Sequence, residues 1–366
     1  MKSDKVAVLS CVIAVAIALP AVAQNEIMRI GQIVPLTGPL SNVGKEITAV
    51  TQAAFDEHNA KSTTLKFELV TEDDGNNPER SAAAVTAIAG KTTALLSCFG
   101  TVGCMAQMKA AQSAKLPLIG PIAGAAQLRD KQAKFVYAVR ASASDELNRL
   151  IRFAQTVGFT NLSVAVQDDG FGQGYLATLK PLLEGSGLAI KELALINPKA
   201  PDYDAVADGL RKSQTHALLL LANATHSVGV MKAWSAQAPL PFVLNLPGQT
   251  NSLFANGLKG YKGGASFATV TPSPWDVKMQ IQRDYQLAMT NAKIQNLSYL
   301  GFESYINARI AIEAAKRASN RSSAAVAAVL DGGQISVSGW DWKNVDPTQS
   351  RYTDLALLRP DGTFRH

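Results

Sequence analysis

The stretch SCFGTVGCMAQMKAAQSAKLPLIGPIAGA, residues Ser97–Ala125, decides the fold. Its first residues end the apolar run 94–98, which is typical of a buried parallel strand. Small residues at 100–103 then form a turn before a segment of helix formers, 105–114. A second apolar run, 116–120, ends in another small-residue turn. Both turns are expected at the carboxyl ends of neighbouring strands, where doubly wound α/β sheets bind ligands.

The first of these turns can bind an anion. The amides of residues 101–104 would point out of the start of a helix, and an anion is the ligand that a helix N-terminus favours. The alternative is an ordinary turn between strand and helix, of which every doubly wound protein has several.

Strands and helices continue to alternate on both sides of this stretch, which predicts an α/β fold with mainly parallel sheets. A second series begins at Arg140. There Ser144 is placed to cap a helix whose first turn carries Asp145 and Glu146. Pro272-Ser273-Pro274 fixes an extended connector, which we interpret as a crossing between two lobes.

Length and composition agree with two lobes of ordinary size. The chain has 366 residues, of which 47% are hydrophobic and 17% charged. Its net charge of +6 is spread along the sequence without a run of Lys or Arg. Nucleic acid is therefore not an expected partner.

The N-terminus resembles a secretory signal peptide. Lys2 and Lys5 precede the apolar segment Val6–Leu19, and Ala21-Val22-Ala23 follows as a small-residue cleavage site. The apolar segment would form a helix of about 21 Å, too short for a hydrocarbon core of ~30 Å. We expect cleavage of residues 1–23 and a soluble periplasmic protein.

Two cysteines remain after this cleavage, Cys98 and Cys104. In an oxidising compartment they could form a short-loop disulfide. They could equally be two small buried hydrophobic residues. The sequence leaves both interpretations open, because it does not show whether the side chains meet.

Motifs of catalysis and of cofactor binding are missing. The four histidines are scattered, and none has metal-ligand spacing. Gly170-x-Gly172-x-Gly174 follows a strand, but Asp168 and Asp169 precede it and would repel a pyrophosphate. We therefore expect no catalytic residue, no metal and no cofactor.

Several segments together resemble the periplasmic solute-binding proteins of ABC importers, in the group that includes the leucine/isoleucine/valine-binding protein. The segments that carry the resemblance are IGQIVPLTGPLSNVGKEI, TEDDGNNPERS, FGTVGC, LPLIGPIAGA, VRASASDEL and AVQDDGFGQGYLATL. They occur in order between about Ile27 and Trp275. The resemblance implies the type I fold, in which two Rossmann-like lobes are joined by a three-strand hinge and close on a ligand.

The resemblance also implies lobe boundaries. Lobe 1 would comprise residues 24–140 and 273–337, and lobe 2 residues 141–272 and 338–366. The three crossings would be Arg140–Ala143, Val270–Ser273 and a segment near Ser336–Trp340.

The family's ligand site can be transferred position by position. Its two carboxylate-binding turns correspond to Gly100–Cys104 and Ile122–Gly124. Thr101 stands where the family has a key Ser, and Gly124 where it has Thr. The resemblance implies these ligand-binding residues: Val43, Thr101, Val102, Gly103, Ala123, Gly124, Phe171, Ala224 and Leu246.

Two departures concern the ammonium group of an amino-acid ligand. Leu246 replaces the family's ammonium-binding Glu, and Ala224 replaces a Tyr. A buried ammonium without a partner costs several kcal/mol. Either Asp168, Asp169 or another acid takes over, or the ligand has no ammonium group, and we favour the second reading.

The sequence therefore predicts a non-enzymatic, monomeric protein that captures a small carboxylate-bearing solute with high affinity. The ligand would be an apolar amino acid or an aromatic or aliphatic carboxylate. The protein would deliver it to the membrane permease of an ABC importer. A ligand-sensing module for a membrane receptor is the alternative. An exported α/β enzyme is a third reading, which the missing motifs disfavour.

Overall fold

The computed structural model describes residues 26–130, 132–249, 254, 264–344, 351–359 and 364–365. The predicted signal peptide, residues 1–23, lies outside these ranges. Within them, no helix has the length and apolar character needed to cross a membrane.

Lobe 1 is built on a five-stranded parallel sheet with the order β2-β1-β3-β4-β5. Its strands are β1 (Glu26–Val34), β2 (Leu65–Asp73), β3 (Ala94–Leu96), β4 (Leu118–Ile119) and β5 (Val136–Tyr137). Its N-terminal helices are α1 (Ser41–Lys61), α2 (Pro78–Ile88), α3 (Thr101–Ala114) and the short η1 (Ala126–Arg129). Its C-terminal elements are α9 (Gln280–Asn291), α10 (Tyr299–Arg317), α11 (Ser323–Asp331), β11 (Gln334–Val337) and β12 (Trp340–Lys343).

Lobe 2 is built on a seven-stranded sheet with the order β14-β13-β10-β9-β8-β6-β7. The parallel strands are β6 (Asn161–Gln167), β7 (Ala189–Ile196), β8 (Ala217–Leu221), β9 (Phe242–Asn245) and β10 (Ala265–Thr269). The antiparallel edge is formed by β13 (Asp354–Leu358) and β14 (Phe364–Arg365). The helices are α4 (Ala143–Thr156), α5 (Gly170–Leu183), α6 (Tyr203–Leu210), α7 (Ala224–Ser235) and the short η2 (Pro247–Gln249). The prediction of an α/β fold with mainly parallel sheets is confirmed.

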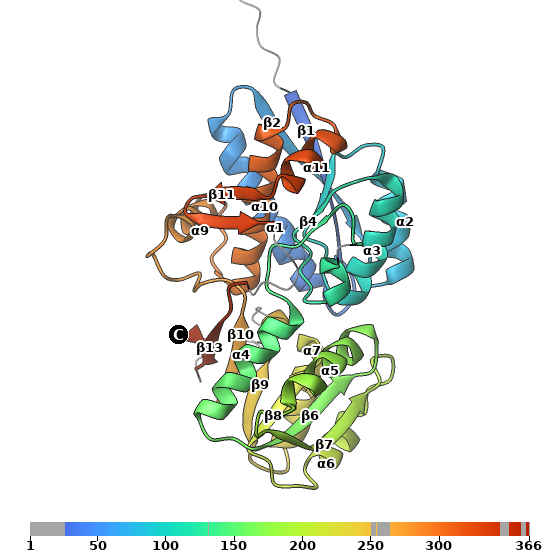
Figure 1. The fold of residues 1–366 in the computed structure, drawn as a ribbon, viewed down its shortest axis with the longest axis vertical. Coiled ribbons are helices and arrows are strands. Elements are labelled where there is room, and N and C mark those ends of the chain that lie inside the picture. The colour runs from blue at the N-terminus through green and yellow to red at the C-terminus, as the bar shows by residue number, and fades with distance from the viewer. Residues whose placement is uncertain are drawn as a thin grey trace, which may run out of the picture.

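Each lobe has its own hydrophobic core because helices cover its sheet on both faces (Figure 1). β8, with the sequence ALLLL, is fully buried, as expected for a central parallel strand. In lobe 1, Phe302 and Tyr305 of α10 pack in one cluster with Met28 and Phe67 of the sheet. The C-terminal helices therefore complete the core of the N-terminal lobe.

The chain passes between the lobes three times. The first two passages lie between β5 and α4 and between β10 and α9, and so include the predicted crossings at Arg140–Ala143 and Val270–Ser273. The third lies between β12 and β13. The crossing expected near Ser336–Trp340 is instead the turn of the β11–β12 hairpin, whose Trp342 is buried in the lobe 1 core. Residues 338–343, assigned to lobe 2 from the sequence, thus pack with lobe 1.

The start of α4 differs from the sequence prediction. Its N-cap is Ser142, not Ser144. The Ser142 hydroxyl accepts a hydrogen bond from the Asp145 amide, and the Asp145 carboxylate accepts one from the Ser142 amide. This reciprocal capping box satisfies two backbone donors at once, which a cap at Ser144 would not do.

Candidate functional site

A cavity opens between the two lobes, at the carboxyl ends of strands from both sheets. It encloses about 740 Å³ of unfilled space, including its mouth. Eight of the nine predicted ligand-binding residues line it: Val43, Thr101, Val102, Ala123, Gly124, Phe171, Ala224 and Leu246. The structure thus brings together residues that are distant in sequence, from both sides of the cleft.

Gly103 is the predicted residue that does not line the cavity. A Cβ atom at this position would lie 3.4 Å from Ser81 Oγ and 3.5 Å from Asp74 Oδ2. The α-carbon of Gly103 therefore faces the start of α2. Burial raises the pKa of the neighbouring Asp74 carboxyl, although Ser81 donates a hydrogen bond to it.

The lobe 1 wall of the cavity contains the start of α3. Gly100 precedes the helix with φ of 75°, a left-handed conformation that favours glycine. No described side chain caps the helix. The Thr101 hydroxyl lines the cavity and is buried, and no described residue hydrogen-bonds to it. The amides of the first turn have no partner within the helix. This wall therefore presents hydrogen-bond donors to the cleft.

The turn before α3 is closed by a disulfide between Cys98 and Cys104, with the Cα atoms 5.3 Å apart. Both cysteines are fully buried, and the disulfide interpretation of the sequence is confirmed, whereas that of two unbridged hydrophobic residues is wrong. The bond spans the turn that carries Gly100 and Thr101.

The lobe 2 wall combines apolar and polar side chains. Phe171, Ala224 and Leu246 contribute its apolar part. Gln167, Asp169 and Asn223 also line the cavity and were not among the predicted residues. Two of them, Asp169 and Asn223, could be expected at helix starts from the sequence, because Asp and Asn directly before a helix are typical N-caps.

These polar residues are already bonded to one another and to the backbone. Asp169 Oδ1 accepts from the amides of Phe171 and Gly172, and Asp169 Oδ2 accepts from Gln167 Nε2 at 2.6 Å. Asn223 Oδ1 accepts from the amide of His226. The N-termini of α5 and α7 are thus capped by lobe 2's own side chains.

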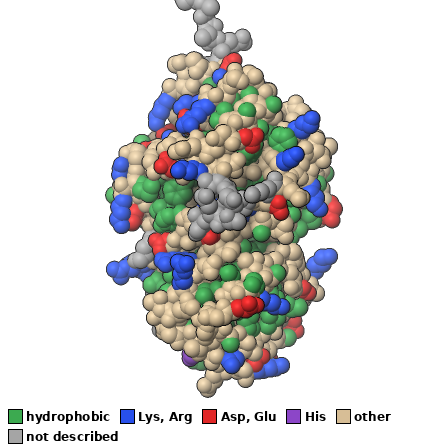
Figure 2. Space-filling view, viewed as in Figure 1, with side chains coloured by type: hydrophobic (Ala, Val, Ile, Leu, Met, Phe, Trp, Pro, Cys, Tyr) green, Lys and Arg blue, Asp and Glu red, His purple; other side chains and the backbone are tan. Residues whose placement is uncertain are grey.

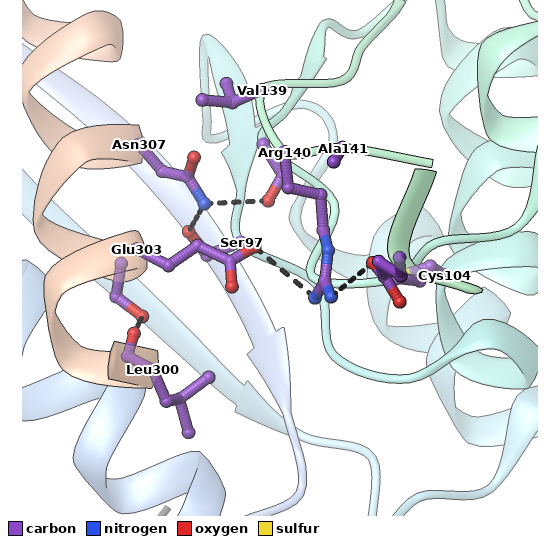
Figure 3. A network of polar contacts seen from close by, with 12 residues as sticks. Ser97, Cys104, Val139, Arg140, Ala141, Leu300, Glu303 and Asn307 are labelled. Carbon is purple, nitrogen blue, oxygen red and sulfur yellow. Dashed lines mark hydrogen bonds and ion pairs between the residues drawn. The ribbon is translucent and has the colours of Figure 1, made fainter. Parts of the chain in front are cut away.

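A buried group of charges lies between the lobes, and Figure 3 shows two of its members, Arg140 and Glu303, facing each other. Arg140 lines the cavity from the first connection, and its Nη2 lies 2.7 Å from Glu146 Oε1 of α4. Arg140 Nη1 lies 3.5 Å from Glu303 Oε1 of α10. The Tyr175 hydroxyl of α5 donates to Glu146 Oε2 at 2.7 Å. The sequence placed Glu146 at a helix start and gave no signal for the other partners, which come from distant segments.

Burial shifts the pKa values of this group. Burial raises the pKa of the Glu303 carboxyl to about 7, and the nearby Arg140 guanidinium only partly opposes the effect. Burial likewise raises the pKa of the Tyr175 hydroxyl well above its usual range. Glu303 is therefore an acid that exchanges its proton near neutral pH.

Arg129 joins the second turn of lobe 1 to the first connection. Its Nη1 donates to the carbonyls of Ala123 and Ala125, both at 3.2 Å. Its Nη2 donates to the carbonyls of Arg140 at 3.0 Å and of Ala141 at 2.8 Å. Burial lowers the pKa of Arg129 to about 10, so the group stays charged at neutral pH.

Gly124 is required by the close approach of two lobe 2 side chains. A Cβ atom there would overlap the Tyr175 hydroxyl oxygen and lie 3.1 Å from Glu146 Oε1. A Thr at this position, which the sequence resemblance implies for the family, would therefore not fit beside Tyr175 in this arrangement.

The arrangement is suited to binding. Within the described ranges, no group of three His, Cys, Asp or Glu side chains could hold a metal ion. The cavity offers an uncapped helix start, a buried hydroxyl and an arginine beside apolar walls. Hydrogen-bond donors at one end and apolar walls at the other suit a ligand that is polar at one end and apolar along its body.

Comparisons with known proteins place this geometry in context. A sequence model of the family described as "Periplasmic binding protein" matches residues 28–362. A search of the curated proteins finds no significant match.

Solved structures share the fold along nearly the whole chain. A substrate-binding periplasmic protein from Ralstonia solanacearum is 24% identical, with a TM-score of 0.82 and 92% of this chain and 99% of that chain covered. A fatty acid ABC transporter substrate-binding protein from Thermomonospora curvata is 17% identical, with a TM-score of 0.79 and coverage of 93% and 91%. A branched-chain amino acid transporter substrate-binding protein from Streptococcus pneumoniae, solved with isoleucine, is 15% identical, with a TM-score of 0.81 and coverage of 93% and 98%. The resemblance seen in the sequence and the type I fold are thereby confirmed.

Proposed function

The chain belongs to the periplasmic binding protein family, and from this premise we propose that it captures a small carboxylate with an apolar or aromatic body and delivers it to an ABC importer. The ligand needs no ammonium group. The two lobes close around it, and the membrane permease recognises the closed form. The predicted signal peptide supports export to the periplasm.

One observation carries the proposal. The Thr101 hydroxyl is buried in the cavity without a described partner, at the start of a helix that no described side chain caps. A buried polar group without a hydrogen bond is costly. A ligand carboxylate would accept from this hydroxyl and from the amides of the first turn, and would also complement the helix dipole.

The rest of the cavity supports an apolar ligand body without an ammonium group. Leu246 and Ala224 bring apolar side chains to the cavity, at positions where the sequence resemblance implies polar residues in amino-acid binders. Among the described residues, Asp169 is the acid on the lobe 2 wall, and it already accepts two hydrogen bonds from the start of α5 and one from Gln167. Asp168 does not line the cavity and accepts from Gln173.

The solved proteins with this fold include one described as a fatty acid carrier and one holding isoleucine. Both ligands carry a carboxylate and an apolar body, and the amino acid alone carries an ammonium group. The fold therefore accommodates either class. The choice between them depends on the cavity residues.

A comparison of matched ligands tests the proposal. Binding of leucine and phenylalanine would be compared by calorimetry with that of their des-amino analogues, 4-methylpentanoate and 3-phenylpropanoate. We expect the des-amino acids to bind at least as tightly as the amino acids. Hundredfold tighter binding of the amino acids would mean that an acid of the cavity holds the ammonium group. Binding of none of the four would contradict the proposed ligand class.

A further inference from the structure

Arg140 is the cation that the cavity and the buried charges share. Its side chain lines the cavity but is only 4% exposed, and its Nε atom has no hydrogen-bond partner among the described residues. It lies between two carboxylates that come from different lobes, Glu146 and Glu303. Figure 3 shows Arg140 extending toward Glu303 of α10.

The two carboxylates are held unequally. Glu146 uses both of its oxygens, one on Arg140 at 2.7 Å and the other on the Tyr175 hydroxyl. Glu303 approaches Arg140 only to 3.5 Å, and its Oε1 makes no hydrogen bond with a described residue. Glu303 is therefore the partner that Arg140 can release at the lower cost.

Arg140 also lies close to the turn that would receive the ligand. Glu146 Oε1, which accepts from Arg140, is 3.1 Å from the position of a Cβ atom on Gly124. Gly124 and the neighbouring Ala123 line the same cavity as Thr101. A ligand carboxylate bound at this turn would thus lie near the Arg140 guanidinium.

Charge balance decides what must accompany such a ligand. Arg129 and Arg140 together balance Glu146 and Glu303 when both acids are ionised. A carboxylate entering beside them would add an uncompensated negative charge to a buried site, which is costly. One proton taken from solvent restores neutrality without any covalent step.

We propose that Arg140 binds the ligand carboxylate together with Thr101, and that Glu303 takes up a proton as the ligand replaces it at the guanidinium. This inference rests on the proposed function and adds the residue that recognises charge. Binding of the anionic ligand is then coupled to the uptake of a proton by Glu303. A neutral ligand would gain no charge–charge attraction from Arg140.

The surroundings of Glu303 favour this role. The charged groups facing it are Arg140 of the first connection, Arg129 of η1 and Glu146 of α4. The nearby Asn307 of α10 is neutral and is bonded to Ser97 and to the Gly120 carbonyl. With the pKa of Glu303 at about 7, the carboxyl is half protonated at neutral pH before any ligand arrives.

Calorimetry with 3-phenylpropanoate at pH 7, in buffers of different ionisation enthalpy, tests the inference. The probe is fully ionised at this pH, so any proton taken up binds to the protein. We expect uptake of about half a proton per bound ligand, since half of Glu303 is already protonated. We also expect affinity to rise by about tenfold in total as pH falls from 8 to 6, with most of the increase between pH 8 and pH 7.

Two variants of α10 locate the proton. Glu303→Gln should bind the probe without proton uptake and with an affinity that no longer depends on pH. Glu313→Gln, on the same helix but paired at the surface with Lys316 and Arg317, should behave as the wild type. Arg140→Lys should bind 3-phenylpropanoate at least tenfold more weakly, with no change for the neutral amide 3-phenylpropanamide.

The outcomes separate this inference from the proposed function. Binding of 3-phenylpropanoate by the wild type without proton uptake overturns the inference and leaves the function intact. Uptake that persists in Glu303→Gln also overturns it. If the wild type binds neither 3-phenylpropanoate nor the other three acids, the proposed function fails and the inference fails with it. The wild-type measurement alone is decisive if a variant does not fold.

Discussion

Helices of both lobes begin at the cavity, but their first turns are satisfied in different ways. In lobe 2, Asp169 caps α5 and Asn223 caps α7, so each helix start is bonded by a side chain of its own chain segment. In lobe 1, α3 begins at Gly100 without a side-chain cap among the described residues. An anion therefore finds open donors on one wall and occupied donors on the other.

The difference shows how a symmetrical architecture gives a polarised site. Both lobes have parallel sheets whose strand ends meet at the cleft, and both offer helix starts there. Among these three helices the capping residue differs, because a glycine precedes α3 whereas Asp precedes α5 and Asn precedes α7. Under the proposed function, the charged end of the ligand would contact lobe 1, and its apolar body would contact Phe171 and Leu246 of lobe 2.

The largest effect is expected from the buried charge of lobe 2. Glu146→Ala removes the closer partner of Arg140 and leaves the Tyr175 hydroxyl without its acceptor. Removing one partner of a buried pair costs about 3–5 kcal/mol. Denaturant unfolding should show this loss, whereas Glu313→Ala at the surface should lose under about 1 kcal/mol. A loss below 1 kcal/mol for Glu146→Ala would mean that the pair is not a stabilising contact.

Glu303, the acid of lobe 1 beside Arg140, should make the free energy of unfolding depend on pH. The pKa of Glu303 is raised from its ordinary value to about 7. The contribution of this group to the free energy of unfolding is therefore fully present below pH 4.5 and is lost as pH rises through 7. The shift corresponds to a decrease of about 3 kcal/mol in the unfolding free energy of the ligand-free protein between pH 4.5 and 8. Glu303→Gln should remove this slope. A slope that is unchanged in the variant would assign it to other groups.

The open helix start itself is tested by Thr101→Ala. A hydrogen bond to a charged group contributes about 1.5–3 kcal/mol, so affinity for a bound carboxylate should fall roughly ten- to hundredfold. Thermal unfolding without ligand should stay unchanged, because the hydroxyl bonds to no described residue. Thr86→Ala, on the exposed face of α2, is the matched control. Unchanged affinity in Thr101→Ala would place the carboxylate elsewhere.

The disulfide distinguishes the lobe 1 wall further. Replacing Cys98 and Cys104 together by Ser opens the loop that spans the α3 turn. The chain-entropy relation gives a loss of about 2 kcal/mol for so short a loop. Chemical unfolding of the oxidised wild type and of the double variant measures it. Two free thiols in the unreduced wild type would contradict the bond.

The smallest effect is expected at the capped wall. Asp169→Ala removes the cap of α5 and should lower stability by about 1 kcal/mol. Affinity for 3-phenylpropanoate should change less than threefold, since the Asp169 carboxylate caps its own helix. A hundredfold loss of affinity for an amino acid in this variant would instead identify Asp169 as the ammonium partner, and would remove the contrast between the two walls.

The sequence predicted the fold and the placement of the turns because those features are local. Buried strands leave continuous apolar runs such as that of β8, and small residues mark the turns that follow them. The third connection was misplaced for a local reason as well. Ser338 and Gly339 form a two-residue hairpin turn, and both have positive φ. A pair that ends in Gly between two apolar segments is the local sequence signal of such a turn.

The buried charges could not be predicted in the same way. Arg140 and Glu303 are 163 positions apart in the sequence, and nothing in either local sequence indicates the other. Glu146 was interpreted through its helix position alone, although its carboxylate is fully buried. Long-range pairing of charges depends on how the lobes pack, which a single sequence does not reveal.

Arg129 is, in effect, a non-covalent cross-link. It holds the carbonyls of the turn at Ala123–Ala125 and those of Arg140 and Ala141 with one side chain. The amide of Ala143, the first residue of α4, donates to the carbonyl of Gly124 in the same turn. Turn, connection and helix start thus form one hydrogen-bonded unit. Any movement of this turn of lobe 1 is therefore coupled, through these hydrogen bonds, to the first residue of α4 in lobe 2.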